Sequence, residues 1–163
     1  MTQQQGTEEV SGTTTRFVLR ILHSYFAISR GMTLGVRAAC FDEEGRIFLV
    51  RHTYVPGWYM PGGGVERRET VPQALEKELR EEGNLVMTEP PQLFHVYYNS
   101  KASVRDHVML YRAKVRQTAP RRPDREIAES GFFDLHDLPV DTTTATLRRL
   151  AEINGEVNPA DIW

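Results

Sequence analysis

The chain has 163 residues, of which 40% are hydrophobic and 26% are charged, and its formal net charge is −2. This length fits one domain with a proper core, and the composition is that of a soluble globular protein. The lack of a basic excess excludes typical nucleic-acid binding, and no apolar run approaches the length of a membrane span. The first fifteen residues lack the pattern of a secretory signal, and the single cysteine, Cys40, excludes an intrachain disulfide. We therefore expect a cytoplasmic protein with a buried thiol.

The N-terminal part predicts a disordered tail followed by an amphipathic helix. Residues 1–15 are polar and rich in Thr and Gln, which is typical of a tail. In residues 16–30 the apolar side chains recur at helical spacing: Phe17, Ile21, Leu22, Tyr25 and Phe26. This helix either packs on the edge of the domain or provides a homodimer contact. We expect residues 16–163 to form a single domain that includes this helix.

A β-hairpin and an aromatic loop are predicted next. The apolar runs 34–42 and 46–52 flank a Glu-Glu-Gly turn and predict two paired strands. The loop 53–60 carries Tyr54, Trp58 and Tyr59 just before three consecutive glycines. Such aromatic side chains either anchor a loop or stack on a base, and Trp58 is the candidate for substrate contact.

The second helix is predicted to begin at Thr70. A hydroxyl at this position suits an N-cap, and Gln73 three residues later completes a capping box. The helix is expected to end near Glu82, because Gly83-Asn84 tolerates the left-handed conformation that stops a helix.

The rest of the chain predicts further strands and a closing helix. Three segments have strand character: 93–99, 107–115 and 130–135. A polar, proline-containing loop is predicted over 118–129. The closing helix is predicted over 142–153, with Leu147 and Leu150 facing the core. Three histidines at strand positions are interpreted as structural: His52, His95 and His107.

Three glutamates crowd the end of the second helix: Glu78, Glu81 and Glu82. On a helical wheel, Glu78 and Glu82 project within the same arc as Leu79, where a merely solvated helix face would not place them. The carboxylates repel one another and lie at the negative end of the helix dipole, and a divalent cation relieves both effects. Oxygen ligands without a Cys or His cluster favour Mg²⁺ or Mn²⁺.

Three glycines precede this helix: Gly62, Gly63 and Gly64. Without side chains, the backbone can approach a ligand or the helix closely. The chain lacks the Gly-Lys-Ser/Thr of a Walker loop. The combination therefore favours a metal-bound phosphate substrate over a nucleotide held by backbone amides.

This spacing resembles the Nudix box, which is Gly, five residues, Glu, seven residues, and then Arg-Glu-apolar-x-Glu-Glu-x-Gly-apolar. Counted from Gly63, the box places Glu69 at its first acid and Glu78 at its second. The paired acids fall on Glu81 and Glu82. The resemblance extends over about 23 residues, and the surrounding strands and closing helix fit the family's plan.

Two positions depart from the box. Lys77 stands where the family has Arg, so the charge is kept but the planar fork that binds a carboxylate twice is lost. Asn84 stands where the family has Gly, and Asn tolerates the left-handed conformation. These changes concern rate and affinity more than the class of reaction.

The resemblance implies an α/β fold, a Nudix-type α/β/α sandwich with a mixed β-sheet between helices. It implies a pyrophosphohydrolase that uses Mg²⁺ or Mn²⁺ to cleave a nucleoside diphosphate linked to another group, with a small molecule as its partner. The alternative is a Nudix-like module that binds or senses nucleotides with little or no turnover. The intact acids of the box argue against that alternative.

The resemblance also implies roles for individual residues. The implied metal ligands are Glu78, Glu81, Glu82 and Gly62. The implied catalytic acids are Glu78, Glu81, Glu82 and the loop residue Glu126, with Glu129 next in line. The candidates for substrate binding are Arg51, Gly63, Gly64 and Trp58, with Arg37 and the arginines of 121–125 as further phosphate ligands. Glu69 and Lys77 are expected to support the site.

Overall fold

The computed structural model describes residues 12–163, and the chain divides at Met32 into two compact units. Residues 1–11, and with them most of the predicted tail, lie outside the described residues. The first unit contains helix α1 (Gly12–Ser29), which begins earlier than the sequence predicts. Its packing on the domain edge or against a second copy stays a prediction. Within the described part of the chain, the helices are too short or too polar to span a bilayer.

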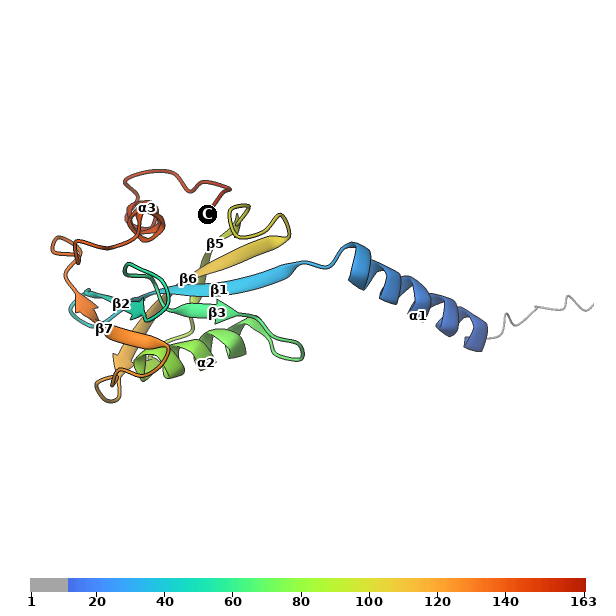
Figure 1. Cartoon of the computed structure of the whole chain (residues 1–163), viewed down its shortest axis with the longest axis horizontal. Helices are drawn as coiled ribbons and strands as arrows, with labels where there is room; N and C mark the ends of the chain where they lie inside the picture. Colours follow the sequence, from blue (N-terminus) through green and yellow to red (C-terminus); the bar gives the residue numbers. More distant parts are fainter. Residues whose placement is uncertain (1–11) are drawn as a thin grey trace, which may run out of the picture. The chain divides into compact units, whose positions relative to one another are not determined.

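The second unit is a mixed β-sheet with two helices. Its elements are β1 (Thr33–Phe41), β2 (Ile47–His52), β3 (Gly62–Gly64), α2 (Val71–Gly83), β4 (Leu85–Met87), β5 (Gln92–Tyr98), β6 (Asp106–Gln117), β7 (Ile127–Phe133) and α3 (Thr144–Ile153). The sheet has the order β4-β6-β1-β2-β7, with β3 paired to β1 and β5 paired to β6 (Figure 1). Strands β1 and β6 run parallel, and the other pairs are antiparallel. The predicted mixed α/β fold is confirmed.

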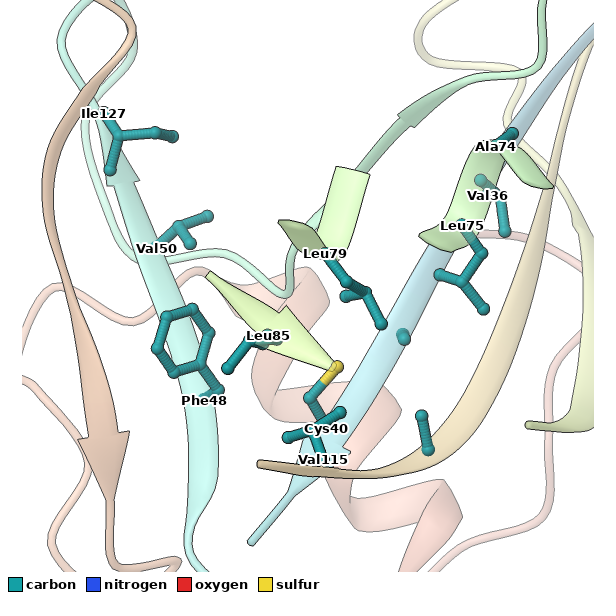
Figure 2. Packing of buried hydrophobic residues seen from close by; sticks show 12 residues of the cluster. Val36, Cys40, Phe48, Val50, Ala74, Leu75, Leu79, Leu85, Val115 and Ile127 are labelled. Carbon is teal, nitrogen blue, oxygen red and sulfur yellow. The ribbon is translucent and has the colours of Figure 1, made fainter. Parts of the chain in front are cut away.

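Alternation along the central strands divides the core into two layers. Cys40 of β1 and Phe48 of β2 pack with Leu79 of α2 on one face of the sheet (Figure 2). Ala39 of β1 faces the other way and packs in the cluster that contains Leu150 of α3. Because successive side chains of a strand point to opposite faces, each face needs its own cover. Helices α2 and α3 provide those covers (Figure 1).

The predicted hairpin and the predicted helix signals are confirmed. Strands β1 and β2 pair antiparallel across the turn. At the start of α2, Gln73 Oε1 accepts a hydrogen bond of 2.8 Å from the Thr70 N–H, and the Thr70 hydroxyl accepts one from the Gln73 N–H. At its end, Asn84 adopts the left-handed conformation with φ of 52°. Local sequence therefore determines both ends of the helix that carries the acids.

The strand predictions need three corrections. The three glycines form a short strand, β3, which the sequence does not predict, because they pair antiparallel with β1. The loop predicted over 118–129 ends at Glu126, because Ile127 begins β7 and pairs with β2. Strand β4 was also not predicted, and it pairs with β6. Each of these segments is too short to show a period of its own and becomes a strand through its partner.

The closing helix is rotated relative to the prediction. Leu150 is buried as expected, but Leu147 is 45% exposed, so its predicted inward position is wrong. The buried face of α3 instead carries Arg149 and Glu152, which form an ion pair of 2.6 Å. Arg149 also lies over the ring of Tyr97. A hydrophobic pattern cannot anticipate a face that is filled by a paired charge.

Gly62 is the glycine that the fold requires most strictly. Its φ is +145°, a region that side chains disfavour. A Cβ atom there would lie 2.1 Å from the Val36 carbonyl oxygen and 2.7 Å from the Arg37 Cα. By contrast, a Cβ on Gly64 would meet nothing within 4 Å.

The two glycines make a matched pair for a stability test. We expect Gly62→Ala to lower the free energy of unfolding by more than about 3 kcal/mol, because backbone strain and a backbone clash add together. Gly64→Ala should change it by less than about 1 kcal/mol. Urea denaturation of the two variants measures the difference. Equal losses would contradict the close approach of β3 to β1.

Candidate metal and active site

A cleft of about 600 Å³ opens beside the C-terminal half of α2. Its lining includes the predicted acids Glu78, Glu81, Glu82 and Glu126, together with Lys77 and Arg121. The structure therefore brings the acids of the helix and the acid of the later loop to one place, although more than forty positions separate them in the sequence.

Glu82 is the buried member of this group and is only 4% exposed. Its Oε2 accepts a hydrogen bond of 2.8 Å from the Gly62 N–H. Its Oε1 lies 3.7 Å from Nε2 of His52, beyond hydrogen-bonding range. Burial raises the pKa of Glu82 to about 7, although the Gly62 hydrogen bond and the charge of Arg37 oppose the rise. One carboxylate oxygen is thus fixed by the backbone, and the other is left without a hydrogen bond.

Glu78 lies one turn earlier on α2 and depends on Gly63. A Cβ on Gly63 would lie 2.5 Å from Glu78 Oε1, so the glycine makes room for this carboxylate. Partial burial raises the pKa of Glu78, and the charge of Lys77 opposes the rise. The close approach of the glycines to the helix, expected from the sequence, is confirmed here.

Glu126 reaches the site from the loop before β7. Its N–H donates to Asp124 Oδ1 at 2.9 Å, and its carbonyl accepts from the Thr53 N–H at 2.9 Å. Its exposed carboxylate belongs to a cluster with Glu82 and His52 in which one ligand atom from each residue lies within 4.8 Å of the others. The backbone of Glu126 is therefore held while its side chain stays free in the cleft.

Arg121 fastens this loop to the end of α2. Its Nε donates to the Glu81 carbonyl at 2.7 Å, and its Nη2 pairs with Asp124. A cation bonded to a carbonyl in the last turn of a helix is favourable, because those carbonyls lack helical partners. Arg121 thus positions the loop, and its role toward substrate phosphate stays a prediction. The Glu81 side chain is exposed and pairs with Arg80 at 3.4 Å.

Glu69 and Lys77 connect the loop that precedes α2 to the helix itself. Glu69 Oε1 accepts from the Glu66 N–H at 2.5 Å and lies 3.5 Å from Lys77 Nζ. Lys77 Nζ is also 3.5 Å from Glu66 and 3.7 Å from Glu78. One ammonium group therefore links the loop to the acidic helix. This arrangement fits the supporting role that we assigned to both residues.

Arg51 and Trp58 lie outside the acidic cleft. Arg51 pairs with Glu129 at 3.2 Å on neighbouring strands. Trp58 is 8% exposed and packs edge-on against Phe133, so its ring belongs to the core. The structure places neither side chain beside the acids. Glu129, the second choice for a loop acid, belongs to strand β7, where it pairs with Arg51 of β2.

Arg37 and His52 both interact with Glu82, which the sequence does not predict. Arg37 Nη1 donates to the Met60 carbonyl at 2.7 Å, and its charge favours the ionised form of Glu82. His52, which the sequence interprets as structural, faces Glu82. A signal for this was present, because Phe48, Val50 and His52 alternate along β2 and share the face that α2 covers.

A second cleft of about 440 Å³ adjoins β3 on its other side. Gly63 and Gly64 contribute to its lining. The remaining polar and aromatic lining includes Arg37, Tyr59, Asn99, Asp106 and Trp163. The glycine strand therefore lines a mixed polar and aromatic cleft, and its Gly63 also lies close to Glu78 of the acidic cleft.

The donors in the acidic cleft fit a divalent cation. Carboxylate oxygens are the ligands that Mg²⁺ and Mn²⁺ prefer. Glu82 Oε1, which makes no hydrogen bond, is an acceptor that a cation would satisfy. Glu78 and Glu126 supply further oxygens at the same cleft.

Comparison with known families decides the assignment. The model of the NUDIX domain matches residues 31–152. The chain belongs to the Nudix family. A comparison with curated proteins gives no significant match. Family and fold together make the chain a hydrolase that acts on pyrophosphate bonds.

Solved Nudix structures share this fold. A MutT Nudix hydrolase from Burkholderia pseudomallei is 28% identical, with a TM-score of 0.62 over 74% of this chain and 97% of its own. An ADP-ribose pyrophosphatase from Streptococcus suis is 26% identical, with a TM-score of 0.55 over 78% of this chain and 94% of its own. The Nudix domain of Shewanella oneidensis NrtR, solved with ADP ribose, is 18% identical, with a TM-score of 0.67 over 85% of this chain and 97% of its own, and this likeness shows the fold alone.

The buried charge of Glu82 predicts a pH effect on the metal-free Nudix domain. The pKa of Glu82 is raised from 4.5 to about 7, so at pH values between these two the folded protein binds a proton that the unfolded chain does not. The stability that neutral Glu82 contributes is present below the unfolded pKa and is lost as pH rises through the folded pKa. Between about pH 5 and about pH 8, we expect the unfolding free energy of Glu82→Gln to gain roughly 2 kcal/mol relative to wild type.

Denaturation in EDTA at both pH values measures this gain. Glu81→Gln is the matched control, because it removes an exposed carboxylate from the same helical turn. This control should follow the wild-type pH dependence. A Glu82→Gln variant that also follows it would show that burial does not raise the pKa of Glu82.

Proposed function

We propose that this Nudix protein hydrolyses a nucleoside diphosphate linked to another group, and that it uses Mg²⁺ or Mn²⁺. The observation that carries the proposal is the arrangement of Glu82. One oxygen is fixed by the Gly62 amide, and the other faces the cleft that Glu78 and Glu126 share. A carboxylate so deeply buried is costly without a cation to neutralise it.

The proposed ligands of the cation are the carboxylates of Glu78, Glu81 and Glu82 and the carbonyl of Gly62. When bound, the cation supplies Lewis-acid polarisation of the pyrophosphate and a lower pKa for the attacking water. The protein supplies the fixed geometry, because Glu82 is held by β3 and Glu78 fits into the space beside Gly63.

Glu126 is the proposed general base. Its carboxylate is exposed in the cleft, and its backbone is held by Thr53 and Asp124. It can therefore accept the proton of a water positioned between it and the helix acids. Glu81, which is also exposed, is the second choice.

The rest of the substrate is proposed to occupy the second cleft. Gly63 and Gly64 line that cleft, and Gly63 also adjoins Glu78, so a diphosphate lying over β3 reaches from one cleft to the other. Arg37 lies at this boundary as a cation for phosphate oxygens. The aromatic rings of Tyr59 and Trp163 offer an apolar wall to a base or sugar. Arg51 and Trp58 stay less favoured candidates.

A substrate panel tests the proposal directly. The full chain is incubated with nucleoside triphosphates, nucleotide sugars, dinucleoside polyphosphates and ADP-ribose in the presence of Mg²⁺ or Mn²⁺, and phosphate products are measured. We expect turnover that EDTA abolishes. Glu78→Gln and Glu82→Gln should each lower kcat/KM by more than about 100-fold. Glu76→Gln, on the exposed side of α2, is the matched control and should retain activity.

The outcomes separate the enzyme from the alternative. Binding of a panel compound without turnover would support a nucleotide-binding module. Full activity in Glu82→Gln would refute the metal assignment even if the protein is an enzyme.

Lys77 tests whether the departure from the box limits the rate. Arginine would keep the charge and add a planar fork able to bond Glu69 and Glu78 together. We therefore expect Lys77→Arg to have activity equal to or higher than wild type, whereas Lys77→Met should lower it, because the charge is lost. Steady-state kinetics on the best panel substrate measure both. A clear loss of activity in Lys77→Arg would show that the loop is fitted to lysine.

A further inference from the structure

We propose that His52 is a direct nitrogen ligand of the metal centre, and that the centre therefore selects a transition-metal cation such as Mn²⁺ or Co²⁺ over Mg²⁺. This inference rests on the proposed use of the helix acids as metal ligands. It adds a residue that lies outside the Nudix box and changes the expected metal preference.

The first observation is that His52 is buried without a hydrogen bond. Its side chain is 6% exposed, and its Nδ1 has no partner among the described residues. Its Nε2 is 3.7 Å from Glu82 Oε1, which is too far for a hydrogen bond. Nε2 is therefore free to bind a cation beside Glu82, and such binding would leave the buried Nδ1 as it is.

The second observation is the spacing of the donors around His52. Two atoms that each lie about 2.1 Å from one cation are separated by roughly 3.0 to 4.2 Å, depending on the angle between them. The distance of 3.7 Å from Nε2 to Glu82 Oε1 falls within this range. Glu126 also brings an oxygen to the cluster, and its exposed side chain can adjust.

The position of the ring is set by the fold. His52 is the last residue of β2, and the pairing of β2 with β7 shifts register between Arg51 and His52. The rings of Tyr54 and Tyr59 lie 5.1 and 5.8 Å from the imidazole. These two neighbouring rings restrict the imidazole before any cation arrives, which lowers the entropic cost of ordering it as a ligand.

The competing explanation is a histidine that only fills space at the end of the core. Such a residue would bond one nitrogen to a backbone carbonyl or a side chain. His52 instead lies in a cluster with the carboxylates of Glu82 and Glu126 and makes no such bond. Mg²⁺ prefers oxygen ligands alone, whereas a nitrogen ligand favours first-row transition-metal cations, with affinity that rises from Mn²⁺ to Co²⁺.

The direct test is an electron paramagnetic resonance measurement of bound Mn²⁺, and it needs no variant. Mn²⁺ is added to the full-length protein, and electron spin echo modulation is recorded for natural-abundance and ¹⁵N-histidine-labelled samples. We expect modulation from one directly bound imidazole nitrogen, which changes on labelling. Mn²⁺ bound without nitrogen coupling would overturn the proposal and leave the hydrolase assignment intact.

Affinity measurements give an independent readout. Calorimetric titration should show that wild-type protein binds Mn²⁺ at least about tenfold more tightly than Mg²⁺. His52→Gln should lose about tenfold or more in Mn²⁺ affinity but change Mg²⁺ affinity by less than about threefold. His136→Gln, which removes an exposed imidazole far along the chain, is the matched control and should behave as wild type.

The affinities lost for Mn²⁺ and Mg²⁺ distinguish a metal-binding role of His52 from a purely structural role. Equal losses for both cations in His52→Gln would indicate a general disturbance and would contradict the proposal. Unchanged Mn²⁺ affinity in a folded His52→Gln variant would also overturn it. If neither cation binds the wild-type protein, the metal site of the proposed function is refuted instead.

Discussion

The hydrogen bond from the Gly62 amide to the Glu82 carboxylate joins the two parts of the site. Gly62 belongs to a short strand pressed so closely against β1 that a side chain would overlap the Val36 carbonyl. Glu82 belongs to the last turn of α2, where the dipole and the neighbouring acids disfavour a negative charge. The bond fixes one oxygen of this buried acid and leaves the other facing the cleft. Strand, helix and charge are thus held in one arrangement.

The remaining residues of the site follow from that arrangement. Gly63 gives Glu78 its space, and Lys77 links the same acid to the loop below. On the other side, Arg121 bonds to the end of α2 and thereby positions the loop that carries Glu126. The protein therefore stabilises this cluster of carboxylates with backbone hydrogen bonds and with the basic side chains of Lys77 and Arg121. The divalent cation of the proposed function would offset the repulsion that remains among these acids.

The two proposals share Glu82 and Glu126 but depend on different further residues. In the proposed function, hydrolysis depends on the acids of the family box, and these residues follow the spacing of the motif. The metal preference depends on His52, which comes from β2 and lies outside the motif. If the imidazole binds the cation, the box fixes the reaction while a residue of the neighbouring strand adjusts which metal serves it. The two assignments can fail separately, because one is measured by turnover and the other by coupling to nitrogen.

The sequence alone determined the family, the limits of α2 and the acids that face the cleft, because these depend on local signals: a capping box, a left-handed stop and a fixed spacing of charges. The hairpin was likewise predictable from its turn and apolar runs. Only the tertiary structure decided that the glycines pair as a strand, that Leu147 faces solvent and that His52 faces Glu82. These features depend on contacts between distant segments, and a local pattern carries no information on which partner fills a face or meets a side chain.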